Sequence, residues 1–116
     1  MATYIVNSVY DLISKLYGAE VSREDPATNL SLGVADLIVL QNNPRRLSFV
    51  VVNLSANVVY LKPNAPATAT SGIRLAASGG SLTVNFLTDL HLASLEWHGL
   101  ASGAASTIYI TSVVLR

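Results

Sequence analysis

The first apolar pattern in the chain has the spacing of one helix face. Its members are Val9, Leu12, Ile13, Leu16 and Tyr17. Ser8 followed by Asp11 resembles a shortened capping box, and Gly18 stands where a helix is expected to stop. The pattern therefore predicts an amphipathic helix of about ten residues, which is too short to be stable alone. Its apolar face is expected to pack either on the same chain or on a neighbour.

Residues 19–33 break the helical pattern and concentrate charge. They contain Glu20, Arg23, Glu24 and Asp25, and Pro26 prevents a helix from running through. This composition predicts a solvated linker. Residues 1–33 are therefore expected to form an arm of helix and linker in front of a separate domain.

From residue 34 onward, the pattern changes to short β-branched runs separated by turn residues. The expected strands are 34–40, 46–53, 57–62, 73–75, 81–86, 90–97 and 106–115. Runs of this length and spacing are typical of an antiparallel β-sandwich or a jelly-roll-like barrel, here of about seven strands. The intervals contain no amphipathic helices, which argues against a parallel α/β sheet. Residues 34–116 are therefore expected to be one mainly β domain.

The run 46–53 begins the most apolar hairpin of the sequence. Leu47, Phe49 and Val51 share one face, and apolar residues also occupy the other face, so the hairpin is expected inside a sheet or under a cover. Arg45 and Arg46 stand at its start, where the chain is expected to emerge at the rim. They could bind the carboxylates of a partner bidentately, or they could simply be solvated.

The composition favours an assembling protein. Charged residues make up 12% of the chain, against about 25% in average proteins, and apolar residues make up 51%. A monomer would have to expose much of this apolar surface, which favours an oligomer or a part of a larger assembly over a monomer coated with small polar residues. The formal net charge of zero argues against nucleic-acid binding. No apolar run approaches the roughly 20 residues that span a bilayer, and the N-terminus does not resemble a signal peptide.

The sequence carries few candidates for chemistry. It has no cysteine, no G-x-S-x-G motif, no P-loop and no dinucleotide fingerprint, so we expect no enzyme and no cofactor. The pairs Asp89/His91 and Glu96/His98 could ligate a metal if they meet in space, or form hydrogen bonds at a rim. Trp97 is the one aromatic residue expected to be exposed, and it could stack on a sugar.

Three stretches resemble small virion proteins of tailed bacteriophages. They are NPRRLSFVVVNLSANVVYLKP (43–63), SGIRLAASGGSLTV (71–84) and LEWHGLASGAASTIYI (95–110). In that pattern an arginine-led strand is followed by an Asn-rich turn, a glycine-rich segment, an aromatic strand, a loop of small residues and a final strand. The likeness extends from Pro44 to Ile110.

This resemblance implies a β-sandwich that decorates or cements a capsid on the surface of the virion. The implied partners are copies of the chain itself, with a homotrimer favoured, and the lattice of a major capsid protein. The alternative is a tail or fibre component that binds a receptor or a carbohydrate. Under the capsid hypothesis, the expected contacts are Arg45, Arg46 and the helix face. That face consists of Val9, Leu12, Ile13, Leu16 and Tyr17.

Overall fold

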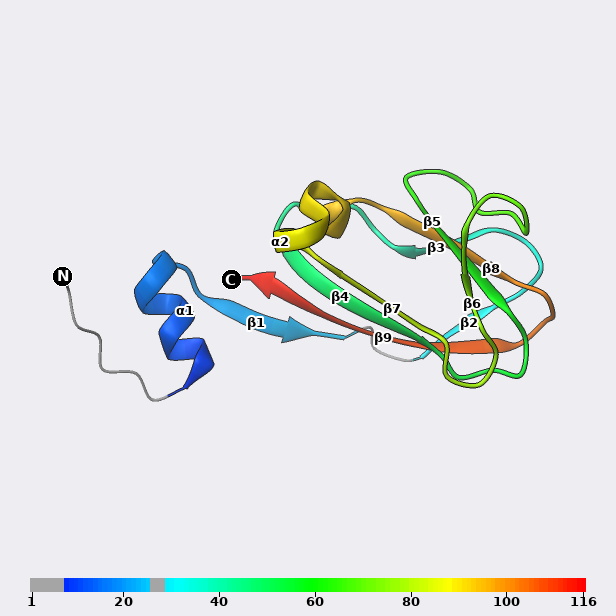
Figure 1. The fold of residues 1–116 in the computed structure, drawn as a ribbon, viewed down its shortest axis with the longest axis horizontal. Helices are drawn as coiled ribbons and strands as arrows, with labels where there is room; N and C mark the ends of the chain where they lie inside the picture. The colour runs from blue at the N-terminus through cyan, green and yellow to red at the C-terminus, as the bar shows by residue number, and fades with distance from the viewer. Residues whose placement is uncertain (1–7, 26–28) are drawn as a thin grey trace.

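A computed structural model describes residues 8–25 and 29–116 of the chain. It is an antiparallel β-sandwich of two sheets, which confirms the predicted fold class (Figure 1). The first sheet contains β1 (Val21–Glu24), β2 (Leu30–Leu32), β4 (Arg46–Asn53), β7 (Ser81–Asn85) and β9 (Ser106–Leu115). The second sheet contains β3 (Leu37–Leu40), β5 (Val59–Pro63), β6 (Ile73–Leu75) and β8 (Trp97–Ala101).

The order of strands places the two longest ones at the centre of the first sheet. Its order is β1-β9-β4-β7, and β2 also pairs with β9, next to β1 along the same edge. The second sheet has the order β3-β8-β5-β6. Along β9, buried and half-buried residues alternate over the whole strand, as expected for a strand with one face on the core.

The core lies between the two sheets and is centred on aromatic and branched side chains. The rings of Phe49 and Trp97 meet edge to face, with their centroids 5.2 Å apart. The Trp97 indole nitrogen donates to the carbonyl oxygen of Leu92 at 2.9 Å, so its polar atom is satisfied inside the protein. The largest apolar side chains of this core are Trp97, Phe49, Leu32, Leu61, Ile108 and Ile110.

The predicted N-terminal helix is present as α1 (Val9–Tyr17). The Ser8 side chain accepts a hydrogen bond from the Asp11 backbone N–H at 3.1 Å, which satisfies one of the free donors of the first turn. Gly18 ends the helix in the left-handed region at φ 65° and donates its N–H to the Ser14 carbonyl. Both predicted helix ends are therefore confirmed.

The expected linker contains two strands that the sequence did not indicate. β1 pairs with the C-terminal half of β9, and β2 pairs with its N-terminal half. Val21 and Leu32 are buried, while Arg23 and Glu24 stay exposed at the sheet edge. The prediction of a solvated linker over 19–33 is therefore wrong for these strands, because β9 offers each of them a long-range partner.

The segment expected as a strand over 90–97 is mostly helical. The helix α2 (Phe86–Asp89) precedes it, the 3₁₀ helix η1 (Leu90–Ser94) occupies most of it, and β8 begins only at Trp97. Local capping explains the difference. The Asn85 side chain accepts from the Thr88 N–H at 3.1 Å, and the Asp89 carboxylate accepts from the Asn85 N–H at 3.0 Å. This reciprocal pair closes a helical turn directly after β7.

A buried asparagine organises the turn that connects β4 in the first sheet with β5 in the second. Asn53 is fully buried, and its side-chain amide nitrogen donates to the Asn57 carbonyl at 2.7 Å and the Ala76 carbonyl at 3.1 Å. Its side-chain oxygen accepts from the Ser55 N–H at 3.0 Å and from the Ser55 hydroxyl at 2.7 Å. The predicted Asn-rich turn is present, and one side chain ties it to the loop after β6. The expectation that the two strands form a hairpin inside one sheet is wrong, because β4 pairs with β7 and β9 whereas β5 pairs with β6 and β8 in the other sheet.

The molecule is elongated, with extents of 54 × 23 × 21 Å. Figure 1 shows the cause: α1 lies beyond the end of the sandwich, near the end of β9, and is joined to the body through β1. Within residues 8–25 and 29–116, no helix is long and apolar enough to cross a membrane.

Candidate assembly surface

α1 and the near end of the sandwich enclose an open apolar cleft of about 490 Å³. One wall is α1, and the other wall comes from α2 and from the ends of β4 and β9. The residues that line the cleft are Leu12, Ile13, Leu16, Tyr17, Ala19, Val21, Leu47, Phe86, Leu87 and Leu115. We call this region the arm cleft. None of its lining residues carries a charge.

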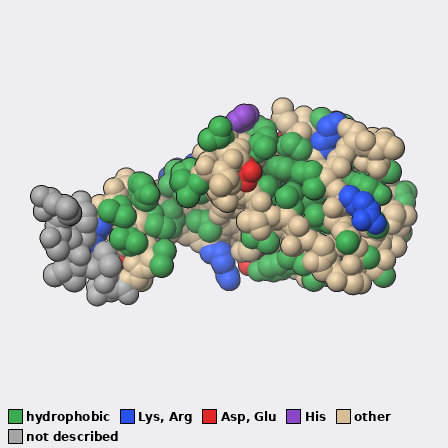
Figure 2. All heavy atoms as spheres, viewed as in Figure 1, with side chains coloured by type: hydrophobic (Ala, Val, Ile, Leu, Met, Phe, Trp, Pro, Cys, Tyr) green, Lys and Arg blue, Asp and Glu red, His purple; other side chains and the backbone are tan. Residues whose placement is uncertain are grey.

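The walls of the arm cleft remain largely open to solvent. On α1, Leu16 is 52% exposed and Tyr17 is 72% exposed, and Val9 beside the cleft is 73% exposed. On α2, Phe86 is 45% exposed and Leu87 is 73% exposed. Figure 2 shows hydrophobic side chains gathered over α1 and over the adjoining end of the body. Contiguous apolar surface of this kind marks an interaction site more often than a solvated face.

The five helix residues predicted for partner contacts all lie on α1. Leu12, Ile13, Leu16 and Tyr17 line the arm cleft, and Val9 lies one turn before Leu12 and Ile13 on the same face. Their own chain covers this face only in part, since Leu12 is still 37% exposed. Their role in binding a partner stays a prediction.

The two arginines at the start of β4 have different surroundings. Arg45 is exposed, and its contact role stays a prediction. Arg46 is only 5% exposed, so the expectation that it emerges at the rim is wrong. The reason is that carbonyl groups of neighbouring loops converge on its guanidinium group inside the chain.

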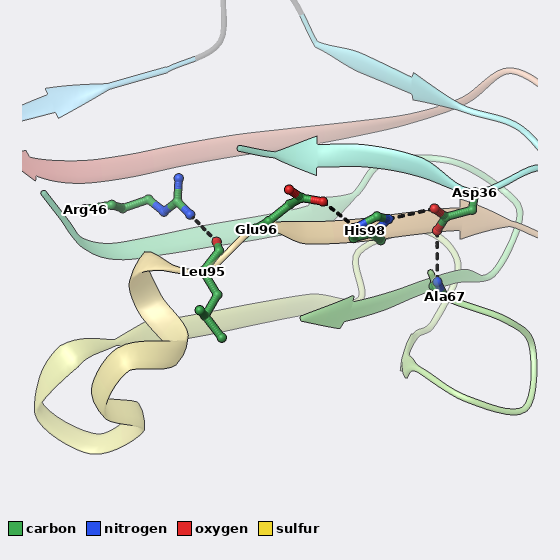
Figure 3. Close-up of polar contacts among 6 residues, drawn as sticks. All are labelled: Asp36, Arg46, Ala67, Leu95, Glu96 and His98. Carbon is green, nitrogen blue, oxygen red and sulfur yellow. Dashed lines mark hydrogen bonds and ion pairs between the residues drawn. The ribbon is translucent and has the colours of Figure 1, made fainter. Parts of the chain in front are cut away.

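Arg46 holds together the segments that surround the start of β4. Its guanidinium donates to the carbonyl oxygens of Ala93 at 2.8 Å, Gln41 at 3.0 Å and Leu95 at 2.6 Å. Figure 3 shows the bond to Leu95, just before β8. The guanidinium also lies over the Phe49 ring, 5.6 Å from its centroid. Burial lowers the pKa of Arg46 from its ordinary value, and the nearby Glu24 carboxylate opposes that shift.

His98 on β8 bridges two carboxylates (Figure 3). Its Nδ1 lies 2.7 Å from Asp36, and its Nε2 lies 2.6 Å from Glu96. The other Asp36 oxygen accepts from the Ala67 N–H at 2.9 Å, so the bridge connects β8 with the turn before β3 and with the loop after β5. With an acceptor at each ring nitrogen, the doubly protonated imidazolium fits this position best.

The bridge predicts a pH-dependent stability. The hydrogen bond to Asp36 is the main cause of a raised pKa for His98, the bond to Glu96 adds to it, and burial acts in the opposite direction. Because the folded pKa lies above the unfolded value, the stabilisation is fully present below the unfolded pKa of about 6.5 and is lost as pH rises through the folded pKa. We expect the melting temperature to fall over that window. Melting curves from pH 5.5 to 9 measure this.

Two histidine variants separate this effect from general pH dependence. His98→Gln is expected to remove the fall in melting temperature, because glutamine does not titrate. His91→Gln, at an exposed position on η1, is expected to leave it unchanged. An equal pH profile in wild type and His98→Gln would show that the bridge does not contribute.

The other side chains considered for metal or sugar binding lie apart from one another or contact groups of their own chain. Asp89 caps α2, so the pairs Asp89/His91 and Glu96/His98 do not combine. Among the described residues, no three His, Cys, Asp or Glu side chains are grouped so as to hold a metal ion. Trp97 is 1% exposed in the core, so the expectation of an exposed aromatic platform for sugars is wrong.

The body wall of the arm cleft is the part that sequence reasoning missed. Phe86 was expected at the end of the strand 81–86 and Leu87 in the connection after it, whereas both lie on α2. Asn85 and Asp89 are the signal that could have found them, because a capping residue and an acidic residue bracket a helical turn.

Comparison with known proteins gives little further information. No protein-family model matches the chain, and a search of curated proteins finds no match either. Among solved structures, the chain is similar to a protein of Bacillus endospore appendages, described as a family of disulfide-linked pili. The identity is 15% over 82% of this chain and 88% of that chain, with a TM-score of 0.47. At this level, neither a function nor a mode of assembly transfers to this chain.

Proposed function

We propose that this chain is a structural virion protein of the capsid decoration, or cement, type, which binds an assembled phage head and stabilises it. The observation that carries the proposal is the apolar surface of α1 and the sandwich end, which its own chain leaves largely uncovered. A chain with 12% charged residues gains more from hiding such a surface in an assembly than from exposing it as a monomer.

The sequence resemblance supplies the identity of the assembly. It implies a β-sandwich, and the antiparallel sandwich fits that expectation. The proposed partners are other copies of the chain and the lattice of a major capsid protein, at the surface of the virion. Repeated sites on a lattice make weak contacts cumulative, because each bound copy stabilises the assembled state over the dissociated one.

The polar clusters of the described residues fit a structural role better than a catalytic one. Asn53, Arg46 and His98 each direct their polar atoms to groups of their own chain. We therefore propose no enzymatic activity. The alternative of a carbohydrate-binding tail or fibre protein has less support, since Trp97 lies in the core.

The proposal is tested on heads of the phage whose genome encodes the chain, assembled without it. Purified chain is expected to co-sediment with these heads at a fixed stoichiometry and to raise the temperature at which they release DNA. Failure to bind heads, or binding without any rise in that temperature, would contradict a cement role.

Arg45 provides a more specific prediction on the same assay. Arg45→Glu is expected to weaken head binding about two- to fivefold, which is the range of one exposed ion pair. Arg74→Glu is the matched control, because Arg74 is also an exposed arginine but lies on the edge strand β6. Equal binding by the two variants would remove Arg45 from the contact surface.

A further inference from the structure

The arm cleft selects an apolar occupant. Its lining residues are aliphatic or aromatic, and none of them is charged. The charged side chains of α1 lie on the opposite side of the helix, where Lys15 pairs with Asp11 at 3.1 Å. The cleft therefore offers nothing to a phosphate, a nucleic acid or a charged peptide.

The shape of the cleft favours a protein surface over a small molecule. Its volume of about 490 Å³ lies within the range of ligand pockets. A ligand pocket, however, buries most of its ligand, whereas Tyr17 and Leu87 on opposite walls are both more than 70% exposed. An occupant that covers these walls as well as the cleft has to be larger than a small molecule.

The exposed area matches what a stable contact between two proteins needs. The residues concerned are Val9, Leu12, Leu16, Tyr17, Phe86 and Leu87. Taking about 200 Å² for each fully exposed large side chain, their exposed fractions amount to about 700 Å². A protein interface of standard size takes about 800 Å² from each partner.

α1 itself has the properties that the occupant requires. α1 is a helix of nine residues with an uncharged apolar stripe along one face. It lies at the end of the molecule and is connected to the body through Gly18. A second copy presents the same stripe. The stripe can therefore line the cleft of its own copy and also enter the cleft of another copy. In a two-fold pair each stripe enters the cleft of the other copy, and in a ring each stripe enters the cleft of the next copy.

We propose that the arm cleft of one copy receives α1 of a second copy. The side chains of the incoming stripe, led by Leu16, pack between the α1 and α2 walls of the receiving copy. A reciprocal pair and a closed ring both contain this contact, including the homotrimer expected from the sequence. This contact rests on the proposed function in one respect, namely that the chain acts by assembling with other copies.

Light scattering coupled to size exclusion tests the contact on the full chain. Wild type is expected to form a dimer or trimer, and Leu16→Glu and Leu87→Glu are each expected to raise the dissociation midpoint at least tenfold in concentration. Leu54→Glu is the control, since Leu54 is 53% exposed against 52% for Leu16 but lies in the β4–β5 loop. Melting temperatures show whether each variant remains folded.

Disulfide trapping identifies the two surfaces that meet. The sequence contains no cysteine, so single cysteines can be placed without background. A Leu16→Cys chain mixed with a size-tagged Leu87→Cys chain is expected to give a mixed cross-linked species on oxidation. A Leu54→Cys chain in place of Leu87→Cys is expected to give none.

The possible results separate this inference from the proposed function. A monomer at all concentrations overturns the inference and leaves the capsid lattice as the proposed occupant of the cleft. An oligomer that both glutamate variants leave intact also overturns it. A monomer that still binds and stabilises heads contradicts the contact between copies but supports the proposed function. An oligomer that gives the expected cross-link but does not bind heads supports the contact and contradicts the proposed function.

Discussion

Replacing Asn53 by alanine is expected to lower the free energy of unfolding by about 3–5 kcal/mol. The change removes all the hydrogen bonds of this buried side chain, to the carbonyls of Asn57, Leu75 and Ala76 and from the N–H and hydroxyl of Ser55. Each of these hydrogen bonds contributes about 0.5–1.5 kcal/mol, and their loss accounts for the expected range. Since a domain is stable by only about 5–15 kcal/mol in total, the variant should lie close to unfolding at 37 °C. Urea denaturation measures the loss.

A second substitution and a control define this effect. Asn53→Asp keeps the shape of the side chain but places an acceptor against the carbonyls of Asn57 and Ala76, so it is expected to be at least as damaging. Asn42→Ala, at an exposed position in the turn before β4, is expected to change stability by less than about 0.5 kcal/mol. A loss below about 1 kcal/mol for Asn53→Ala would mean that the connection between β4 and β5 does not depend on this side chain.

Replacing Arg46 by methionine is expected to lower the free energy of unfolding by about 3–5 kcal/mol. The methionine keeps much of the apolar stem but leaves the carbonyls of Ala93, Gln41 and Leu95 without their donors. Arg46→Lys should fall between wild type and methionine, because one ammonium group does not match three carbonyls in the geometry of a guanidinium fork. Urea denaturation gives the size of the loss.

Hydrogen exchange locates the effect of the Arg46 variants. Faster exchange is expected first in α2 and η1, because the bonds to Ala93 and Leu95 hold the end of this helical segment. Arg45→Met is the neighbouring control on an exposed side chain, with a change of less than about 0.5 kcal/mol expected. Exchange that rises evenly over the whole chain would show that Arg46 does not act on this segment in particular.

This difference between the arginines affects how the assembly surface is tested. Reversing the charge of both would disturb the α2 wall of the arm cleft through Arg46, in addition to any direct effect through Arg45. Loss of head binding in that double variant would therefore not identify a contact. Only Arg45→Glu separates binding from folding.

The sequence predicted best those features that are fixed by neighbouring residues. The helix α1 was predicted because Ser8, the apolar stripe and Gly18 are all local signals. The strands 46–53, 73–75 and 106–115 were predicted with the observed bounds, since they are β-branched runs between turn residues. The Asn-rich turn between β4 and β5 was also a local signal.

The features that were missed depend on partners far away in the chain. β1 is half charged and β2 has only three residues, so neither is long or apolar enough to be predicted as a strand, and their strand conformation comes from pairing with β9. Arg46 and Trp97 stand at the ends of strands in the sequence and were therefore expected at the exposed rim, but tertiary packing buries both side chains. Of the candidate site, the α1 wall was predicted and the α2 wall was not, because the strand 81–86 was expected to include Phe86 and residues 87–89 were left as a connection.

The position of β9 has a consequence for how the protein comes to be made. β9 is the last described strand along the chain, yet it lies between β4 on one side and β1 and β2 on the other. Until β9 has been synthesised, β1, β2 and β4 lack the strand that pairs with all three of them. The pairing of Val21 with Leu115 shows how large the loop is that must close at the end. The β4–β7 pair can form earlier, but the first sheet is complete only after the whole of β9 has left the ribosome. Contacts of such long range place folding in the slow range of about milliseconds to seconds.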